Sequence, residues 1–382
     1  MYDAIGTTPV ILRAPIGYYL PVAAVAAGLE LPRPEILLYA WTAFGFALVL
    51  CTATTLLPSR RERALGVALM LAFGGLDLLG FRLAKGELPA LGAHVDWWAQ
   101  FAQYSSSSTL LFWVPNHALP AWMGAMLVLR HWRTLELARM APLLVTATML
   151  WSPLSALGLV PFLLAGLPRR RAQTALMCLR SGLPFVVPAL LAAAYITMDT
   201  NTVARGMGID QFTTAHDFWT RYGLFCMLEF GILALLLAGL RAVDLKVGVA
   251  IMALLLLPLF RFGGGNDLVM RSSIPALTVL ALATVRPLLT AGSRLLRSLL
   301  GLVLAIGAIG ALQEPARAWL TPAWPPTGQT LAEVSFSEHA PFGITQLPNI
   351  YVAQLNRPGL QWLMRQPRPV QPYANAASEP SR

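Results

Sequence analysis

The sequence predicts an all-α fold: a polytopic bundle of about eight transmembrane helices, with additional short or re-entrant helices and a short extracytoplasmic C-terminal segment. Composition is the first reason, since 56% of the 382 residues are hydrophobic and only 12% are charged. That is roughly half the charged fraction of a typical soluble domain. Segmentation is the second reason, because the apolar residues form runs of about 15–23 residues, long enough to cross a hydrocarbon core about 30 Å thick.

The positive charge of the chain is concentrated in short loops between the apolar runs. The formal net charge is +10, and among the 28 basic residues only Lys85 and Lys246 are lysines. In a soluble protein this excess would suggest nucleic-acid binding, but arginines in short loops between spans are the positive-inside signature of membrane proteins. We therefore expect no nucleic-acid partner. Five basic loops are assigned to the cytoplasm: 60–63, 130–139, 169–180, 241–246 and 286–297.

This orientation divides the apolar runs into spans and loops. The predicted spans are 35–57, 64–84, 108–129, 182–198, 219–240, 247–261, 272–286 and 296–313. A shorter apolar segment at 16–29 precedes them, and the external loops are 85–107, 199–218 and 261–271. Residues 1–313 are thus predicted to form the transmembrane domain, followed by an extracytoplasmic segment at 314–366. The polar tail at 367–382 is predicted to be disordered.

The apolar stretch 140–168 has arginines near both ends and Trp151-Ser152-Pro153 in its middle. Proline interrupts a helix and leaves carbonyl groups unpaired. Broken helices are tolerated at membrane depth where they are packed inside protein or face a cavity. The stretch is therefore predicted to be a re-entrant hairpin of two half-helices with both ends in the cytoplasm.

Two carboxylates fall where burial makes them costly. Asp77 lies inside the second predicted span and Glu229 inside the span at 219–240. An ionised carboxylate at such a depth costs about 2.5–3.5 kcal/mol on insertion scales, so it needs a partner or a wet cavity. For Asp77 a catalytic role and a structural ion pair with an arginine are both consistent with the sequence.

The first external loop contains His94, Asp96, Trp97 and Trp98 close together. An indole stacks on the face of a sugar ring while carboxylate and amide groups bind its hydroxyls. An acid and a histidine directly before two indoles are therefore candidates for a sugar platform, with Asp96 as the candidate base. Paired tryptophans also form the aromatic belt at membrane interfaces, which is the commoner role.

Asn116 and His117 lie between Pro115 and Pro120 near the outer end of the third predicted span. A neutral imidazole acts as an acid, a base or a hydrogen-bond partner near pH 7. His117 is therefore a catalytic candidate and Asn116 a substrate-binding candidate. A packing role for both remains the alternative.

A glycine-rich segment connects two later spans. It runs from Arg261 through three glycines to Asn266 and Asp267 and ends at Arg271. Glycines allow backbone N–H groups to approach an anion, and the planar guanidinium of arginine binds phosphate through two hydrogen bonds. The segment lacks the Gly-Lys-Ser/Thr ending of a P-loop. It is predicted to bind a lipid-linked phosphate, with a simple turn as the alternative.

Four segments together resemble a largely uncharacterised group of bacterial multi-pass membrane proteins. They are Gly75-Leu76-Asp77, the stretch from Asp96 to Ser106, the segment from Trp113 to Trp122, and Asn266 to Pro275. The resemblance covers most of residues 15–310. That group is in turn similar to the GT-C class of glycosyltransferases, which have many spans, re-entrant helices and an extracytoplasmic C-terminal portion.

The resemblance implies an enzyme of the bacterial cytoplasmic membrane that moves a sugar from a polyprenyl-phosphate carrier to an extracytoplasmic glycan or lipid. A carboxylate of the first external loop would be the general base, and Arg261 and Arg271 would hold the carrier phosphate. The chain departs from the GT-C pattern because no complete span precedes residue 35. Either the base is Asp77 or Asp96, or the chain lacks an N-terminal part.

No cofactor is implied. The three cysteines have no metal-binding spacing, although an acid pair formed across loops would suit Mg²⁺ or Mn²⁺. Two other classes stay open. A lipid or solute transporter would use the 140–168 hairpin with Asp77 and Glu229 as its pathway, and a membrane assembly factor would have no catalytic site.

Overall fold

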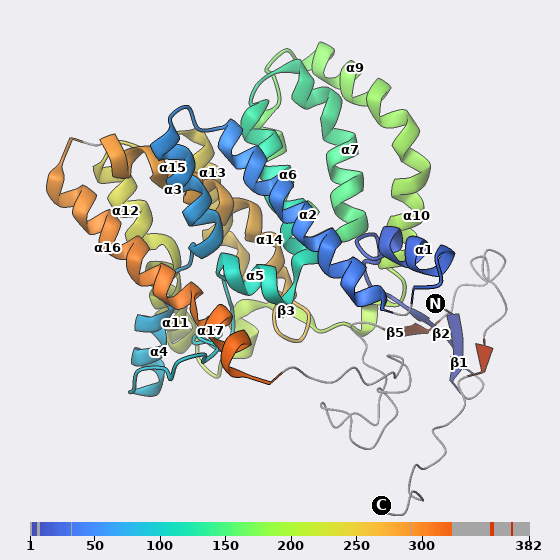
Figure 1. Cartoon of the computed structure of the whole chain (residues 1–382), viewed down its shortest axis with the longest axis horizontal. Coiled ribbons are helices and arrows are strands. Elements are labelled where there is room, and N and C mark those ends of the chain that lie inside the picture. The colour runs from blue at the N-terminus through green and yellow to red at the C-terminus, as the bar shows by residue number, and fades with distance from the viewer. Residues whose placement is uncertain are drawn as a thin grey trace, which may run out of the picture. The chain divides into compact units, whose positions relative to one another are not determined.

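The computed structural model describes residues 2–5, 8–31, 33–290, 292–322, 352–354 and 368–369, and most of these are helical (Figure 1). The described chain divides into two units. Unit 1 comprises residues 1–14, 190–204 and 323–382, and unit 2 comprises residues 15–189 and 205–322. Most of the predicted extracytoplasmic segment at 314–366 and of the disordered tail at 367–382 lies outside the described residues.

Unit 1 contains a small β-sheet, which the all-α prediction does not include. Its strands are β1 (Tyr2–Ile5), β2 (Thr8–Leu12), β5 (Val352–Gln354) and β6 (Arg368–Pro369), in the order β5-β2-β1-β6. β1 and β2 form an antiparallel hairpin, β2 pairs antiparallel with β5, and β1 pairs parallel with β6. Segments this short and this far apart in sequence give no strand periodicity to recognise, so this small sheet is an addition to a fold that is mainly helical, as predicted.

Unit 2 is the helical bundle. Its first half contains α1 (Leu20–Gly28), α2 (Pro34–Thr55), α3 (Arg60–Ala72), α4 (Asp77–Lys85), α5 (Ser107–Trp113), α6 (Pro115–Arg130), α7 (Leu135–Trp151), α8 (Pro153–Gly166) and α9 (Arg171–Gly182). α10 (Val186–Ile196) continues into unit 1. The second half contains β3 (Arg205–Met207), α11 (Ala215–Cys226), the π-helical turn η4 (Met227–Gly231), α12 (Ile232–Gly239), α13 (Leu245–Leu256), β4 (Phe260–Phe262), α14 (Asp267–Ser272), α15 (Ile274–Thr290), α16 (Arg294–Ala311) and α17 (Gln313–Leu320).

Within the described residues, six helical stretches are long and apolar enough to cross a membrane. They are Pro34–Thr55, Arg60–Lys85, Arg171–Ile196, Ala215–Gly239, Asp267–Thr290 and Arg294–Leu320. Two shorter apolar helices are Pro153–Gly166 and Leu245–Leu259. Several of these stretches are mostly exposed, as lipid-facing helices are when no bilayer surrounds them. The chain is thus a mainly helical protein with the elements of a multi-pass membrane protein.

The bundle is interrupted where the sequence contains proline or glycine. Ser152 separates α7 from α8, and its hydroxyl caps α8 by accepting the N–H of Ser155 at 3.3 Å. Val114 separates α5 from α6, whose first residue is Pro115. The break within 140–168 is therefore where the sequence predicts it. The second predicted span is also broken, because the chain between Ala72 and Asp77 leaves the helix.

Helix α16 approaches that second break closely. A Cβ atom added to Gly307 would lie 2.3 Å from the carbonyl oxygen of Gly74, so only glycine fits there. On the other side of the break, Leu76 N–H donates to Leu228 O at 3.1 Å, which joins it to the π-helical turn η4. Three elements thus meet at the interruption between α3 and α4.

The basic loops share one end of unit 2. The ends of α2, α6, α12 and α15 line one cavity through Leu57, Leu129, Arg241 and Arg286. Arg133 N–H also donates to Gly166 O at 2.6 Å, which brings in the loop before α9. α4 and α17 lie at the opposite end (Figure 1). Residues that belong to or flank the five basic loops therefore lie on one side of unit 2, and their assignment to the cytoplasm stays a prediction.

Candidate functional site

Three carboxyl groups from separate elements gather in the interior of unit 2, and we call them the acid cluster. Asp77 is the first residue of α4, Asp96 lies in the loop between α4 and α5, and Glu229 lies in η4. Their exposed fractions are 0%, 1% and 4%. Burial of three acids together is costly unless protons, cations or hydrogen-bond donors compensate them.

The π-helical turn and Trp98 hold Glu229 in place. Trp98 Nε1–H donates to Glu229 Oε1 at 2.8 Å. A Cβ atom added to Gly75 would lie 2.4 Å from Glu229 Oε2, so the absence of a side chain at Gly75 makes room for this carboxyl group. π-helical turns recur at functional sites because they displace a side chain from its regular helical position.

The acid cluster is incompletely satisfied. Within the described residues, neither carboxyl oxygen of Asp77 nor Oε2 of Glu229 has a hydrogen-bond partner. The two carboxyl groups lie close enough for one to hydrogen-bond the other when one of them carries a proton. The arginine partner considered for Asp77 is not found, since Arg82 instead donates to Gly86 O. Unsatisfied buried polar atoms are rare in native proteins and often mark a functional site.

Unlike Asp77, Asp96 accepts a hydrogen bond from the backbone. Its Oδ2 accepts the N–H of Ser106 at 2.9 Å, which ties the start of the loop to the cap of α5. Burial raises the pKa of Asp96 above its usual range, and the Ser106 N–H opposes that shift. A carboxylate with a raised pKa binds a proton more readily, which is the property a general base needs near neutral pH.

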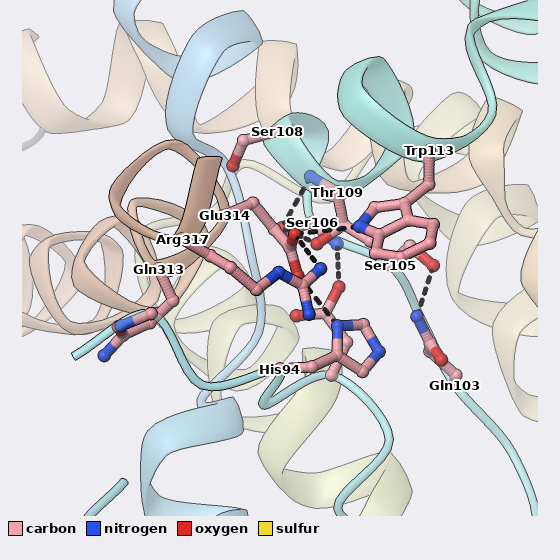
Figure 2. Close-up of polar contacts among 12 residues, drawn as sticks. His94, Gln103, Ser105, Ser106, Ser108, Thr109, Trp113, Gln313, Glu314 and Arg317 are labelled. Atoms are coloured by element: carbon pink, nitrogen blue, oxygen red, sulfur yellow. Dashed lines mark hydrogen bonds and ion pairs between the residues drawn. The ribbon is translucent and has the colours of Figure 1, made fainter. Parts of the chain in front are cut away.

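A second group of side chains gathers around Glu314 (Figure 2). His94 Nδ1 lies 2.8 Å from Glu314 Oε1, and Trp113 Nε1–H donates to Glu314 Oε2 at 2.8 Å. Arg317 forms an ion pair with Glu314, and its guanidinium carbon lies 4.8 Å from the centroid of the Trp113 ring. We call these four residues the Glu314 group.

The Glu314 group is open on its His94 side. The His94 side chain is 33% exposed, whereas that of Glu314 is 4% exposed. The pKa of His94 is raised, chiefly by its hydrogen bond with Glu314 and also by the charge of Asp96. An imidazole in this position links a surface-accessible nitrogen to the buried carboxyl groups.

Sequence reasoning missed most of the Glu314 group. It assigned Glu314 to the beginning of an external segment, whereas α17 continues the helical stretch to Leu320 and turns Glu314 into the interior. A usable signal was present, because Glu314 and Arg317 are spaced three residues apart directly after an apolar helix, which is the spacing of a helical ion pair. Glu229 was recognised as a buried acid in need of a partner.

The two tryptophans of the predicted sugar platform differ in burial. Trp98 is 6% exposed, and a Cβ atom on Gly80 would lie 2.3 Å from its ring, so its indole is packed in the core. Trp97 is half-buried. The two indoles therefore do not form a paired platform, and Trp97 is the more exposed of the two.

Asn116 and His117 belong to a separate, closed network at the break between α7 and α8. Asn116 Nδ2–H donates to His117 Nε2 at 3.3 Å, and His117 Nδ1 lies 2.8 Å from Ser152 Oγ. Ser152 Oγ–H donates to Ser155 Oγ at 2.6 Å, and Ser155 Oγ–H donates to the carbonyl oxygens of His117 and Arg271. Both ring nitrogens of His117 are engaged, which favours a structural role over the predicted catalytic one.

The glycine-rich segment forms a turn between β4 and α14. Asn266, with a φ of 55°, donates from its side chain to Phe101 O at 3.2 Å, so it fixes the turn to the loop that carries Asp96. Asp267 Oδ1 pairs with Arg271 at 2.7 Å. Both partners are thus mutually neutralised, which weakens the predicted clamp of Arg261 and Arg271 on a phosphate.

Arg261 remains available. Its Nε is buried without a hydrogen-bond partner in the described residues. Its side chain lines an open cavity of about 470 Å³ with Gln100, Phe101, Phe212 and Arg221. This cavity combines amides, cations and aromatic faces with the carboxylate of Asp217, which is a lining that suits a sugar or a phosphorylated sugar.

No group of three or more His, Cys, Asp or Glu side chains suited to holding a metal ion occurs in the part of the chain that the structure describes. Comparisons with known protein families, with curated proteins and with solved structures find no match to this chain.

Proposed function

We propose that this chain is a membrane glycosyltransferase that moves a sugar from a polyprenyl-phosphate carrier to an extracytoplasmic glycan or lipid, in the cytoplasmic membrane of a bacterium and on a GT-C-like bundle of about eight spans. One observation carries the proposal. A buried acid cluster lies next to the Glu314 group, so a candidate base and a candidate cation are neighbours at the end of the bundle opposite the basic loops.

The chemistry requires three contributions from the protein. An acceptor hydroxyl attacks the anomeric carbon, its proton passes to a base, and the bond between that carbon and the phosphate oxygen breaks as polyprenyl phosphate leaves. Asp96 is the proposed base, because its raised pKa favours proton uptake. Arg317 replaces Arg271 as the proposed partner of the leaving phosphate, because Glu314 is shared between Arg317 and His94, whereas Asp267 pairs with Arg271. When His94 is protonated, the Glu314 group therefore carries one positive charge in excess.

A lipid carrier also needs an apolar surface beside the reacting groups. Helix α5 offers one, because Trp113 at its end contacts Glu314 while Leu111 and Phe112 line an open cavity of about 490 Å³. The other walls of that cavity include Tyr18, Tyr39 and Phe46. One short helix thus joins the polar site to an apolar groove.

The test uses purified protein reconstituted in lipid with a panel of polyprenyl-phosphate sugars. Donor consumption by the wild type is the first readout. Asp96→Asn is expected to reduce turnover about 100-fold or more, the usual contribution of a general base. Glu87→Gln, which neutralises an exposed acid of the same loop, is the matched control and is expected to leave turnover unchanged. If no donor binds to or is consumed by the wild type, the proposal fails.

The predicted orientation is tested separately. Leu88 is 74% exposed in the loop that carries Asp96. On a background in which Cys51, Cys178 and Cys226 are replaced, Leu88→Cys is expected to react with an impermeant thiol reagent in intact cells. If Leu88→Cys reacts only after the cells are lysed, the loop that carries Asp96 lies in the cytoplasm and the predicted orientation is wrong.

A proton-coupled carrier is the second candidate function. The Asp77–Glu229 pair favours it, because two neighbouring buried carboxyl groups can bind and release a proton within two of the apolar stretches. Solute uptake into vesicles driven by a pH gradient, and lost in Glu229→Gln, would favour the carrier. Donor consumption without a gradient would favour the enzyme.

A further inference from the structure

The end of unit 2 where the basic loops meet carries an open cavity of about 570 Å³. It lies between the ends of α2, α6, α12 and α15 and the start of α13. Three cationic side chains line it: Arg241, Lys246 and Arg286. None of the functions considered above uses this cavity, which we call the basic pocket.

The cations of the basic pocket outnumber the acids near them. Within the described residues, none of the three forms an ion pair with a carboxylate within 4.0 Å. The lining contains one acid, Asp244, whose Oδ1 accepts the N–H of Val247 at 3.0 Å as the cap of α13. Glu62, the acid whose charge interacts with Arg286, accepts the N–H of Ser59 at 2.9 Å. Three cations against one lining carboxylate leave the pocket with excess positive charge.

The remaining walls of the basic pocket are aliphatic. Leu56, Leu129, Val279 and Leu282 contribute apolar surface beside the cations. A free inorganic anion uses only the cations and leaves this apolar surface exposed. A molecule with a phosphate group and hydrocarbon chains satisfies both, because the phosphate pairs with arginine while the chains cover the leucines.

We propose that the basic pocket binds the phosphate group of an anionic phospholipid in the leaflet that faces the basic loops. On the orientation set by the arginine bias this is the cytoplasmic leaflet, where basic pockets between transmembrane helices bind anionic headgroups. Arg241 and Arg286 bind the phosphate from the α12–α13 loop and from α15. The bound lipid contacts the ends of four helices.

The experiment measures lipid retention by native mass spectrometry of the full chain in detergent. Phosphatidylglycerol, cardiolipin and phosphatidylcholine are offered at equal concentration. The wild type is expected to retain phosphatidylglycerol or cardiolipin over phosphatidylcholine. Arg241→Gln/Arg286→Gln is expected to lower the affinity for the anionic lipids about tenfold or more.

Arg169→Gln/Arg170→Gln is the matched control, because it removes the same two charges from an exposed basic loop outside the pocket. Its retention of anionic lipid is expected to match the wild type. Arg241→Lys/Arg286→Lys keeps both positive charges and is expected to retain most of the lipid binding. Loss of binding in the Gln double variant but not in the Lys double variant would then be due to the lost charges and not to misfolding.

Three outcomes overturn the proposal. Equal retention by the Gln double variant and the wild type removes the role of Arg241 and Arg286. Equal loss in the Arg169/Arg170 control shows an effect of net charge alone. Inorganic phosphate or pyrophosphate that displaces the lipid at micromolar concentration identifies a soluble phosphate compound as the ligand.

Discussion

Unit 2 contains two buried polar centres at helix interruptions, and they are satisfied to different degrees. In the closed network, both ring nitrogens of His117 and both hydroxyls of Ser152 and Ser155 have partners. In the acid cluster, three carboxyl oxygens of Asp77 and Glu229 have none in the described residues. Both centres are equally hidden from solvent, so burial does not distinguish them.

This difference in hydrogen-bond satisfaction suggests a structural role for one centre and a functional role for the other. A buried network in which every group is paired rigidifies the fold around it. A buried group without a partner raises the free energy of the folded state and persists where a ligand, a proton or a reaction uses it. We therefore assign the network at His117 to the architecture and the acid cluster to the chemistry, and four predictions test that assignment.

The largest effect is expected for His117→Ala. The variant leaves Ser152 and Asn116 without their imidazole partner and creates a cavity, so it is expected to lower the free energy of unfolding by about 2–4 kcal/mol. Donor turnover of the folded fraction is expected to stay within about threefold of the wild type, since general acid–base groups are worth far more. His216→Ala, at an exposed position, is the control for loss of an imidazole. A stable but inactive His117→Ala would reverse the assignment.

The approach of α16 to the second break is tested by Gly307→Ala. Its Cβ would meet the carbonyl oxygen of Gly74 at 2.3 Å, and backbone on both sides cannot yield easily. A loss of about 1–3 kcal/mol in unfolding free energy is expected from this overpacking. Gly301→Ala, in the same helix, meets only Leu288 at 3.5 Å and is expected to be neutral. Equal effects of the two would show that the break does not depend on this contact.

Asp77→Asn is expected to act in the opposite direction to His117→Ala. Replacing this carboxyl group by an amide gives Glu229 a permanent N–H donor and removes one of two buried acids that repel each other when both are ionised, so stability is expected to rise by about 1 kcal/mol. Thermal unfolding in detergent measures the change, with Glu87→Gln as the control for an exposed acid. Activity is expected to fall, and a destabilised Asp77→Asn would show that the cluster is structural.

The smallest effect is a pH dependence that arises from His94. Its pKa in the folded protein is raised above 6.5 by the hydrogen bond with Glu314. The folded state then binds more protons than the unfolded state, so this contribution to stability is fully present below 6.5 and is lost as the pH rises through the raised pKa. His94→Gln is expected to flatten the dependence of the unfolding temperature on pH as the pH rises from 6.5 through the raised pKa of His94. An unchanged slope would contradict the His94–Glu314 bond.

Much of the architecture can be predicted from the sequence alone. Hydropathy and length identify the apolar helices, and arginine bias places the basic loops together, because both depend on sums over neighbouring residues. Pro153 and Pro115 predict the interruptions before α8 and α6, since proline cannot continue a hydrogen-bonded helix. The burial of Asp77 and Glu229 also follows from the apolar residues around them.

The hydrogen-bond and packing partners of the site residues come from distant segments, so the sequence alone does not predict them. Glu314 becomes part of the site because α17 continues from α16, and Trp98 leaves the surface because Gly80 makes space for its ring. The sheet of unit 1 joins strands from both ends of the chain, which no local pattern indicates.

The sequence by itself thus determined a helical membrane protein with costly buried acids. Only the tertiary structure decided that Asp77 faces Glu229 while His117 is fully bonded. The physical reason is that burial is a property of a segment, whereas hydrogen-bond satisfaction is a property of contacts between distant segments.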